Sequence, residues 1–75
     1  MDHSDGGSSD IRQRLGTNLR RLREEKGWSQ EAFAHEAGIH RTYVSDIERG
    51  ARNPTILVLE RLAKPLGVDV SALLG

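Results

Sequence analysis

Apolar residues recur at intervals of three or four from residue 11 onward, which is the spacing of one face of an α-helix. Gly27 ends the first helical stretch, and Lys26 before it suits the negative carboxyl end of a helix. No strand-like alternation of apolar and polar residues appears, so the pattern predicts an all-α protein. The apolar positions of this first helix are Ile11, Leu15, Leu19 and Leu22.

Two short helices are predicted next, over about residues 30–37 and 40–49. Ser29 stands before the first of them, where a hydroxyl can cap the free amides of a helix start. Gly38 and Gly50 close the two helices, because glycine takes the left-handed backbone of a helix end without steric cost. A turn of only a few residues therefore separates the two helices.

These two helices and their turn have the residue types of a helix-turn-helix. Helices that cross steeply come close together, so Ala34 is small at the contact and Gly38 forms the turn. Val44 and Ile47 are expected to anchor the second helix so that its far side projects. Small helical bundles also place alanine and glycine at crossings, so the pattern alone leaves both interpretations open.

Two more helices complete the predicted fold of five. A loop separates them from residue 49, because Asn53 precedes a proline and is pushed out of helical conformation. Thr55 and Asp69 are the expected N-caps. The apolar positions of these helices are Ile56, Leu59, Leu62, Ala63 and Leu66 in the first, and Val70, Leu73 and Leu74 in the second.

The first ten residues, MDHSDGGSSD, are rich in glycine, serine and aspartate. They predict a flexible acidic tail over 1–10, followed by one domain over 11–75. The tail carries a charge of −3, so the rest of the chain carries +3 although the formal net charge is zero. A basic domain surface is compatible with a nucleic-acid partner, because placement of charge decides such binding.

Composition excludes several classes of function. The chain has 75 residues and no cysteine, so it has a thin core and neither disulfides nor thiolate metal sites. The longest apolar run is four residues, too short for a membrane span, and no signal-like segment opens the chain, so we expect a cytoplasmic protein. Its three histidines are scattered, and only Glu31 and His35 share a helix face. We therefore expect no enzyme activity, metal or cofactor.

One face of the helix over 40–49 is polar. Because a helix turns about 100° per residue, Arg41, Thr42, Ser45, Asp46 and Arg49 share this face, opposite Val44 and Ile47. An ordinary surface helix would show the same division, since its outer face meets water. The neighbouring motifs favour a more specific interpretation.

Residues 15–74 resemble the Cro/Xre helix-turn-helix family, which includes phage repressors. The resemblance rests on "LREEKGWSQE", the alanine and glycine of the turn, "IERG" and "NPT". Within that family, "HRTYVSDIERGARN" is most similar to the small controller proteins of restriction–modification systems. The resemblance implies a lambda-repressor-like domain and a transcriptional regulator that binds a pseudo-palindromic operator in double-stranded DNA as a homodimer. Such a protein would block RNA polymerase or contact it.

The resemblance places the helix over 40–49 in the major groove and assigns roles to its residues. Asp46 could accept from cytosine N4, but a solvent-facing or charge-orienting role is an equal alternative. Tyr43 could reach a phosphate or a dimer partner, or could pack as a half-buried tyrosine. The expected base-reading residues are Arg41, Thr42, Ser45 and Asp46. The expected phosphate contacts are Gln30, Tyr43, Arg49, Arg52 and Asn53.

Structural roles follow from the resemblance and, for the dimer patch, from the apolar residues themselves. Arg23 and Glu48 match a family pair that forms a buried ion pair, and Trp28 is expected in the core. Extra apolar residues near the carboxyl end suggest a dimer patch, although an isolated exposed leucine is common. The expected patch is Leu57, Val58, Val70 and Leu74. The alternative function is an antitoxin or a protein-interaction adaptor on the same fold.

Overall fold

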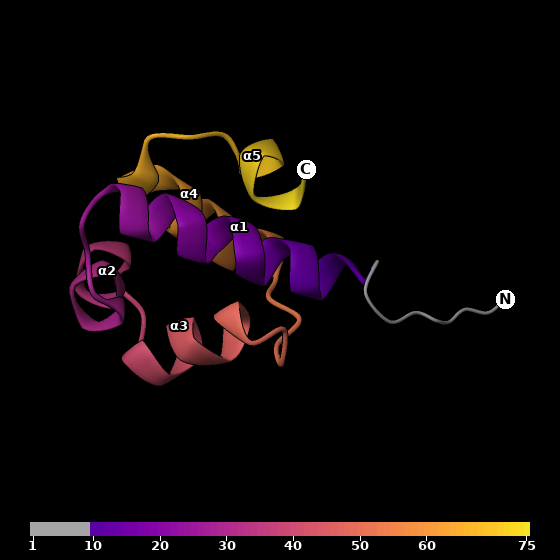
Figure 1. Cartoon of the computed structure of the whole chain (residues 1–75), viewed down its shortest axis with the longest axis horizontal. Coiled ribbons are helices and arrows are strands. Elements are labelled where there is room, and N and C mark those ends of the chain that lie inside the picture. The colour runs from indigo at the N-terminus through magenta and orange to yellow at the C-terminus, as the bar shows by residue number, and fades with distance from the viewer. Residues whose placement is uncertain (1–9) are drawn as a thin grey trace, which may run out of the picture.

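The computed structural model describes residues 10–75, so residues 1–9 of the predicted tail lie outside the described residues. Within 10–75 the chain forms five helices and no strand, as the sequence pattern predicts (Figure 1). The helices are α1 (Ile11–Glu25), α2 (Gln30–Ala37), α3 (Arg41–Glu48), α4 (Ile56–Leu66) and α5 (Val70–Leu74). None of these helices is long and apolar enough to cross a membrane.

Side-chain caps fix where several helices begin. Ser29 and Thr55 accept from the amides of Ala32 at 3.0 Å and Val58 at 3.2 Å, as predicted. Asp10, the last residue of the predicted tail, caps α1 by accepting from the Arg12 amide at 2.8 Å. The hydrogen bonds from Arg12 lower the pKa of Asp10 to about 2.

Asp69 stands at the N-cap position of α5 but its side chain makes no cap hydrogen bond, which corrects the expected capping role. The reason is local. The amide of Ala72 instead donates to the main-chain oxygen of Asp69 at 2.9 Å. The amide that a side-chain cap could bind therefore has a main-chain partner.

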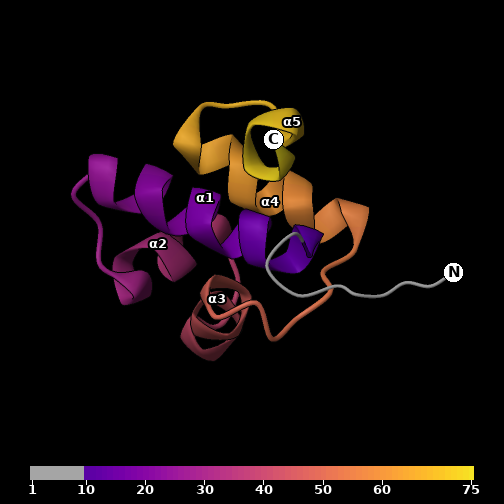
Figure 2. The ribbon, with the colours of Figure 1, turned by 45° about the vertical axis from the view of Figure 1, so that its right-hand side comes forward.

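Helix α1 crosses the middle of the molecule. It packs against α3 on one side and against α4 and α5 on the other, while α2 packs against α3 and α4. In Figures 1 and 2, α3 lies below α1 and α5 lies above it. The core therefore forms between helices that are distant in the sequence. Its largest fully buried side chains are Phe33, Leu19, Ile47, Leu62, Leu73 and Val44.

Two apolar residues of the predicted helix stripes do not enter this core. Ile11 is 48% exposed and Ile56 is 75% exposed. Each is the first residue of its helix. Periodicity identifies the inward direction along a helix but does not show how far the core extends.

Gly16 allows α1 and α3 to come into close contact. A Cβ atom on Gly16 would lie 2.5 Å from the main-chain oxygen of Ile47 and 2.7 Å from that of Glu48. These oxygens belong to the last turn of α3, which a side chain on α1 would push away. Backbone atoms cannot turn aside as a flexible side chain can, so only glycine fits here.

Gly16→Ala should therefore destabilise the protein, by about 1–3 kcal/mol or more, because the added methyl overpacks the helix contact. Helix propensity alone predicts the opposite sign, since alanine stabilises a helix interior by about 1 kcal/mol relative to glycine. Urea unfolding followed by circular dichroism measures the difference. Thr17→Ala, at the exposed neighbouring position, is the control and should change stability little. A stabilised Gly16→Ala protein would contradict the close contact.

Candidate nucleic-acid interface

The turn between α2 and α3 has the expected helix-turn-helix geometry. Gly38 is the C-cap of α2 with φ of 71°, a left-handed conformation that residues with a side chain rarely adopt. The main-chain oxygen of Ala34 accepts from the amide of Ile39 at 3.0 Å, which closes the turn. Ala34 itself is buried, so its small side chain allows the two helices to approach.

Helix α3 lies at the edge of the molecule, held by its apolar side. Val44 and Ile47 are completely buried against the core. Arg41 and Thr42 on the polar side are exposed, while Ser45 and Asp46 are half-buried. The structure therefore brings the four predicted base-reading residues onto one polar side of α3, the helix at the lower side of the molecule in Figures 1 and 2.

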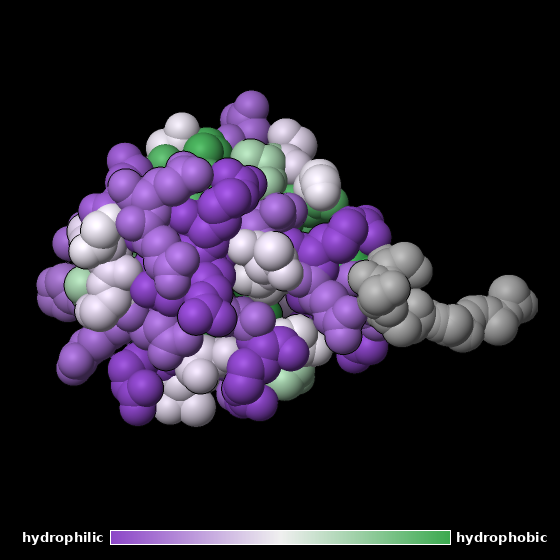
Figure 3. All heavy atoms as spheres, viewed as in Figure 1, coloured by the Kyte–Doolittle hydropathy of each residue, from purple (hydrophilic) through white to green (hydrophobic). Residues whose placement is uncertain are grey.

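The surface seen in Figure 3 is mostly hydrophilic. Hydrophobic side chains show mainly along its upper edge, over the α4–α5 side of the molecule. The polar character of α3 thus continues onto neighbouring elements on this face, whereas the apolar surface gathers on the opposite side of α1.

A buried network fixes α3 against α1. Arg23 Nε donates to Glu48 Oε2 at 2.6 Å and Arg23 Nη2 donates to Glu48 Oε1 at 3.1 Å, so the predicted ion pair is present and bidentate. Arg23 is 8% exposed. Its Nη1 donates to the main-chain oxygen of Trp28 at 2.7 Å. The hydrogen bonds to Glu48 raise the pKa of Arg23, which keeps the guanidinium charged in the interior.

Gln30, an expected phosphate contact, joins the same network. Its amide nitrogen donates to Glu48 Oε1 at 3.0 Å, which ties the start of α2 to the end of α3. This contact was not predicted, because the sequence shows a glutamine at a helix start but not the carboxylate that its amide faces. The side chain of Gln30 thus has a structural partner in the protein without DNA.

A second charged cluster lies at the carboxyl end of α3. Arg49 Nη2 donates to Asp46 Oδ1, and Arg52 Nε donates to Asp46 Oδ2 at 3.2 Å. The guanidinium of Arg52 also lies over the ring of Tyr43, 4.7 Å from its centroid. Three expected phosphate contacts are thus grouped around one expected base reader. Tyr43 is half-buried and packs against the core, as the packing alternative anticipated.

The remaining residues predicted from the sequence lie outside the two charged clusters. Asn53 is exposed in the loop between α3 and α4. Trp28 packs against the core with its ring centroid 6.0 Å from that of Phe33. Leu57 is 72% exposed, and the preceding residue, Ile56, is 75% exposed. Within the predicted dimer patch, the half-buried residues that also pack on the core are Val58, Val70 and Leu74.

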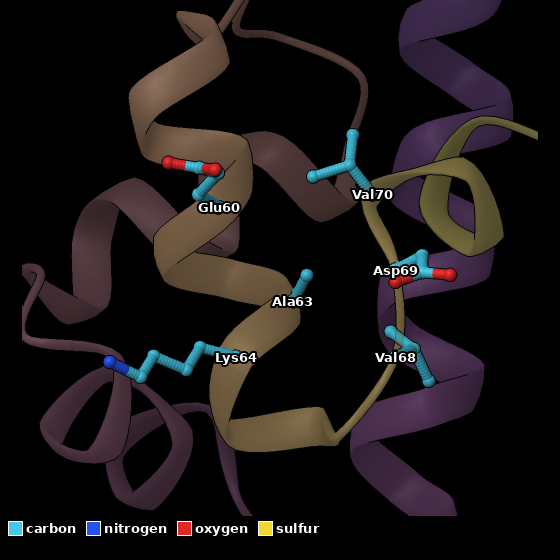
Figure 4. Close-up of a pocket in the computed structure, with 6 residues that line it drawn as sticks. All are labelled: Glu60, Ala63, Lys64, Val68, Asp69 and Val70. Atoms are coloured by element: carbon cyan, nitrogen blue, oxygen red, sulfur yellow. The ribbon is translucent and has the colours of Figure 1, made fainter.

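The structure also shows a shallow pocket of about 360 Å³ between α4 and the segment that leads into α5 (Figure 4). Glu60 and Lys64 border it from α4, and Asp69 borders it from the opposite side. Its mixed charges and its place away from α3 separate it from the predicted site. Among the described residues, no group of three or more histidine, cysteine, aspartate or glutamate side chains could hold a metal ion.

Comparisons with known proteins point to the same kind of domain. A family model described as helix-turn-helix matches residues 19–73. The control protein C.BamHI of Bacillus amyloliquefaciens is 44% identical over 68 residues, which cover 89% of this chain and 84% of that protein.

Two solved structures share the fold. The restriction-modification controller protein C.AhdI from Aeromonas hydrophila aligns with a TM-score of 0.80 and 39% identity, covering 83% of this chain and 94% of that chain. The biofilm regulator SinR, solved in complex with DNA, aligns with a TM-score of 0.78 and 39% identity, covering 81% and 98% of the two chains.

The buried ion pair between Arg23 and Glu48 is expected to matter for the stability of the domain. Arg23→Ala should lower the free energy of unfolding by about 3–5 kcal/mol, because Glu48 would stay buried without its partner. Arg20→Ala is the control, since Arg20 pairs with Glu24 on an exposed face and such pairs contribute about 0–1 kcal/mol. Thermal unfolding of the two variants measures the contrast. Equally small losses in both would show that the Arg23–Glu48 pair does not determine stability.

Proposed function

We propose, because the chain belongs to the Cro/Xre-type helix-turn-helix family, that it is a sequence-specific DNA-binding transcriptional regulator that acts as a homodimer. The outward polar face of α3 is the observation that supports this function most directly. That face projects from a helix whose other side is anchored in the core by Val44 and Ile47. A helix presented in this way fits the major groove of B-DNA.

The residues proposed to read bases lie on that polar face, on which Arg41 and Thr42 are exposed. Arg41 is suited to donate two hydrogen bonds to O6 and N7 of a guanine, the commonest specific contact. Thr42 offers a methyl group for a thymine, and Ser45 a hydroxyl for a base edge. Asp46 is the least available of the four, because both of its oxygens already accept from arginines.

Phosphate contacts surround this face. Arg49, Arg52 and Asn53 follow α3 directly, and the start of α2 at Gln30 offers free amides and a positive dipole to an anion. Tyr43 supports Arg52 through its ring, which is compatible with a contact from its hydroxyl to the same strand. Contacts of this kind position the protein on DNA and carry no sequence information directly.

A dimer makes such a small domain selective. One recognition helix reads only a few base pairs, whereas a two-fold pair reads two half-sites about 34 Å apart. The exposed Leu57, next to Val58 on α4, is the proposed centre of the interface, with Val70 and Leu74 at its edge. Helices α4 and α5, which carry these residues, lie on the other side of α1 from α3 in Figure 2, so pairing through them would leave the polar face free.

The protein would regulate by occupying promoter DNA in the cytoplasm, where it blocks RNA polymerase or contacts it. Its similarity to C.BamHI and C.AhdI favours control of its own operon, including a restriction gene where one is adjacent. Binding to the DNA upstream of its own gene, measured by gel shift, is the direct test. No binding there, with tight binding to a neighbouring toxin, would replace regulation by the antitoxin function.

Arg41→Ala should weaken binding to the cognate operator by about 1–3 kcal/mol and relax the preference at one base pair in each half-site. Gel shifts against the operator and against single-base variants of it measure both effects. Thr17→Ala, on α1, serves as the control because it leaves α3 unchanged. An equal loss on operator and random DNA would identify Arg41 as a phosphate contact.

Leu57→Glu should convert the dimer to a monomer, because it removes apolar burial and places like charges near a two-fold axis. Sedimentation and circular dichroism should show a smaller species with unchanged helicity, and operator binding should require higher protein concentrations. Thr17→Glu adds the same charge on α1 and should remain dimeric. A dimeric Leu57→Glu protein would exclude this interface, and a wild type that is monomeric both free and on DNA would exclude the dimer.

A further inference from the structure

The cluster around Asp46 places a carboxylate between two arginines on the surface proposed to face DNA. Its oxygens accept separately, one from Arg49 and the other from Arg52. The Asp46 side chain is 18% exposed, so it sits deeper than the guanidinium groups that it holds. The guanidinium of Arg52 also lies over the ring of Tyr43, 4.7 Å from its centroid. Both arginines are therefore held in place within the protein itself.

A carboxylate and a phosphate compete for the same partner. Each offers oxygen acceptors and negative charge, and a guanidinium binds either of them through its planar array of N–H donors. Arg49 and Arg52 with Asp46 carry a net charge of +1, whereas the arginines alone would carry +2. A DNA phosphate that approaches either arginine therefore meets a reduced positive charge and a nearby repelling carboxylate.

Building on the proposed function, we infer that Asp46 restrains binding to DNA of arbitrary sequence by competing with phosphates for Arg49 and Arg52. Non-specific binding depends almost entirely on phosphate contacts, so it has nothing to compensate for this competition. At the operator, base contacts from Arg41 and Thr42 hold α3 in the groove while the arginines exchange partners. Asp46 is in this sense a positioning residue for the phosphate contacts rather than a base reader.

Asp46→Asn tests the inference, because asparagine keeps the shape of the side chain and removes its charge. Binding of the variant to random-sequence duplex DNA should become roughly three- to tenfold tighter, the range expected from releasing two partly exposed ion pairs. The plot of log affinity against log salt should steepen by about one unit, because one more phosphate is neutralised. Fluorescence anisotropy over a series of salt concentrations measures both quantities.

Three further variants separate competition from other effects. Glu36→Gln removes one negative charge from the exposed surface of α2, so it controls for net charge alone and should leave the salt slope unchanged. Asp46→Glu keeps the charge and should restore the weak random-DNA binding of the wild type. Adding Arg52→Ala to Asp46→Asn should cancel part of the gain, since one released arginine is then missing.

A spectroscopic measurement addresses the protein without DNA. The Nε–H proton of Arg52 should exchange slowly with water in the wild type, because it is bonded to Asp46, and rapidly in Asp46→Asn. Random DNA should slow it again in the variant, as a phosphate takes the place of the carboxylate. Fast exchange in the free wild type would overturn the inference, since no ion pair would then exist in solution to compete with DNA.

The outcomes with DNA also distinguish the alternatives. If Asp46→Asn binds random DNA with unchanged affinity and unchanged salt slope, the inference is overturned. Weaker binding of the variant to both the operator and random DNA would also overturn it, because Asp46 would then organise the arginines for phosphate. A loss confined to the operator would make Asp46 a base reader and overturn it as well. Failure of the proposed function is separate, because the wild type would then not prefer any operator over random DNA.

Discussion

The buried ion pair between Arg23 and Glu48 fixes the position of α3, and the surface that α3 presents depends on that position. Two charges withdrawn from water are tolerated only when their geometry is nearly ideal, so the pair allows one register of α3 against α1. The Trp28 main-chain oxygen and the Gln30 amide satisfy further hydrogen-bonding groups of the pair. The pair and its two further hydrogen bonds thus connect α1, the start of α2 and the end of α3 at one place.

Helix α1 connects the α3 side of the domain to the α5 side. On one side, Gly16 admits the last turn of α3, and on the other side Asn18 Nδ2 donates to the main-chain oxygen of Leu73 at 2.9 Å in α5. These two residues of α1, two positions apart, therefore connect the recognition helix to the carboxyl-terminal surface. A dimer formed through that surface would hold its two α3 helices at a spacing set by α1 rather than by flexible loops.

Much of this fold could be predicted from the sequence, because helix periodicity and glycine ends are local properties that hydrophobic burial enforces. The helix types and the turn at Gly38 follow from these signals. Ile11 and Ile56 were misplaced because periodicity does not show where the core ends. Gly16 has no distinctive local pattern, since its role comes from a helix that lies some thirty residues later. The cluster around Asp46 depends on side-chain conformations, which charge spacing alone does not determine.

The division of α3 into a buried side and an exposed side affects how the protein can diverge. Val44 and Ile47 are buried in the core, whereas Arg41 and Thr42 are exposed. Duplicated copies of the gene could therefore exchange the outward residues freely while their folding stays intact. New operators would become accessible through a few substitutions, without passing through unstable intermediates. Two such copies in one cell would share a scaffold and yet recognise separate promoters.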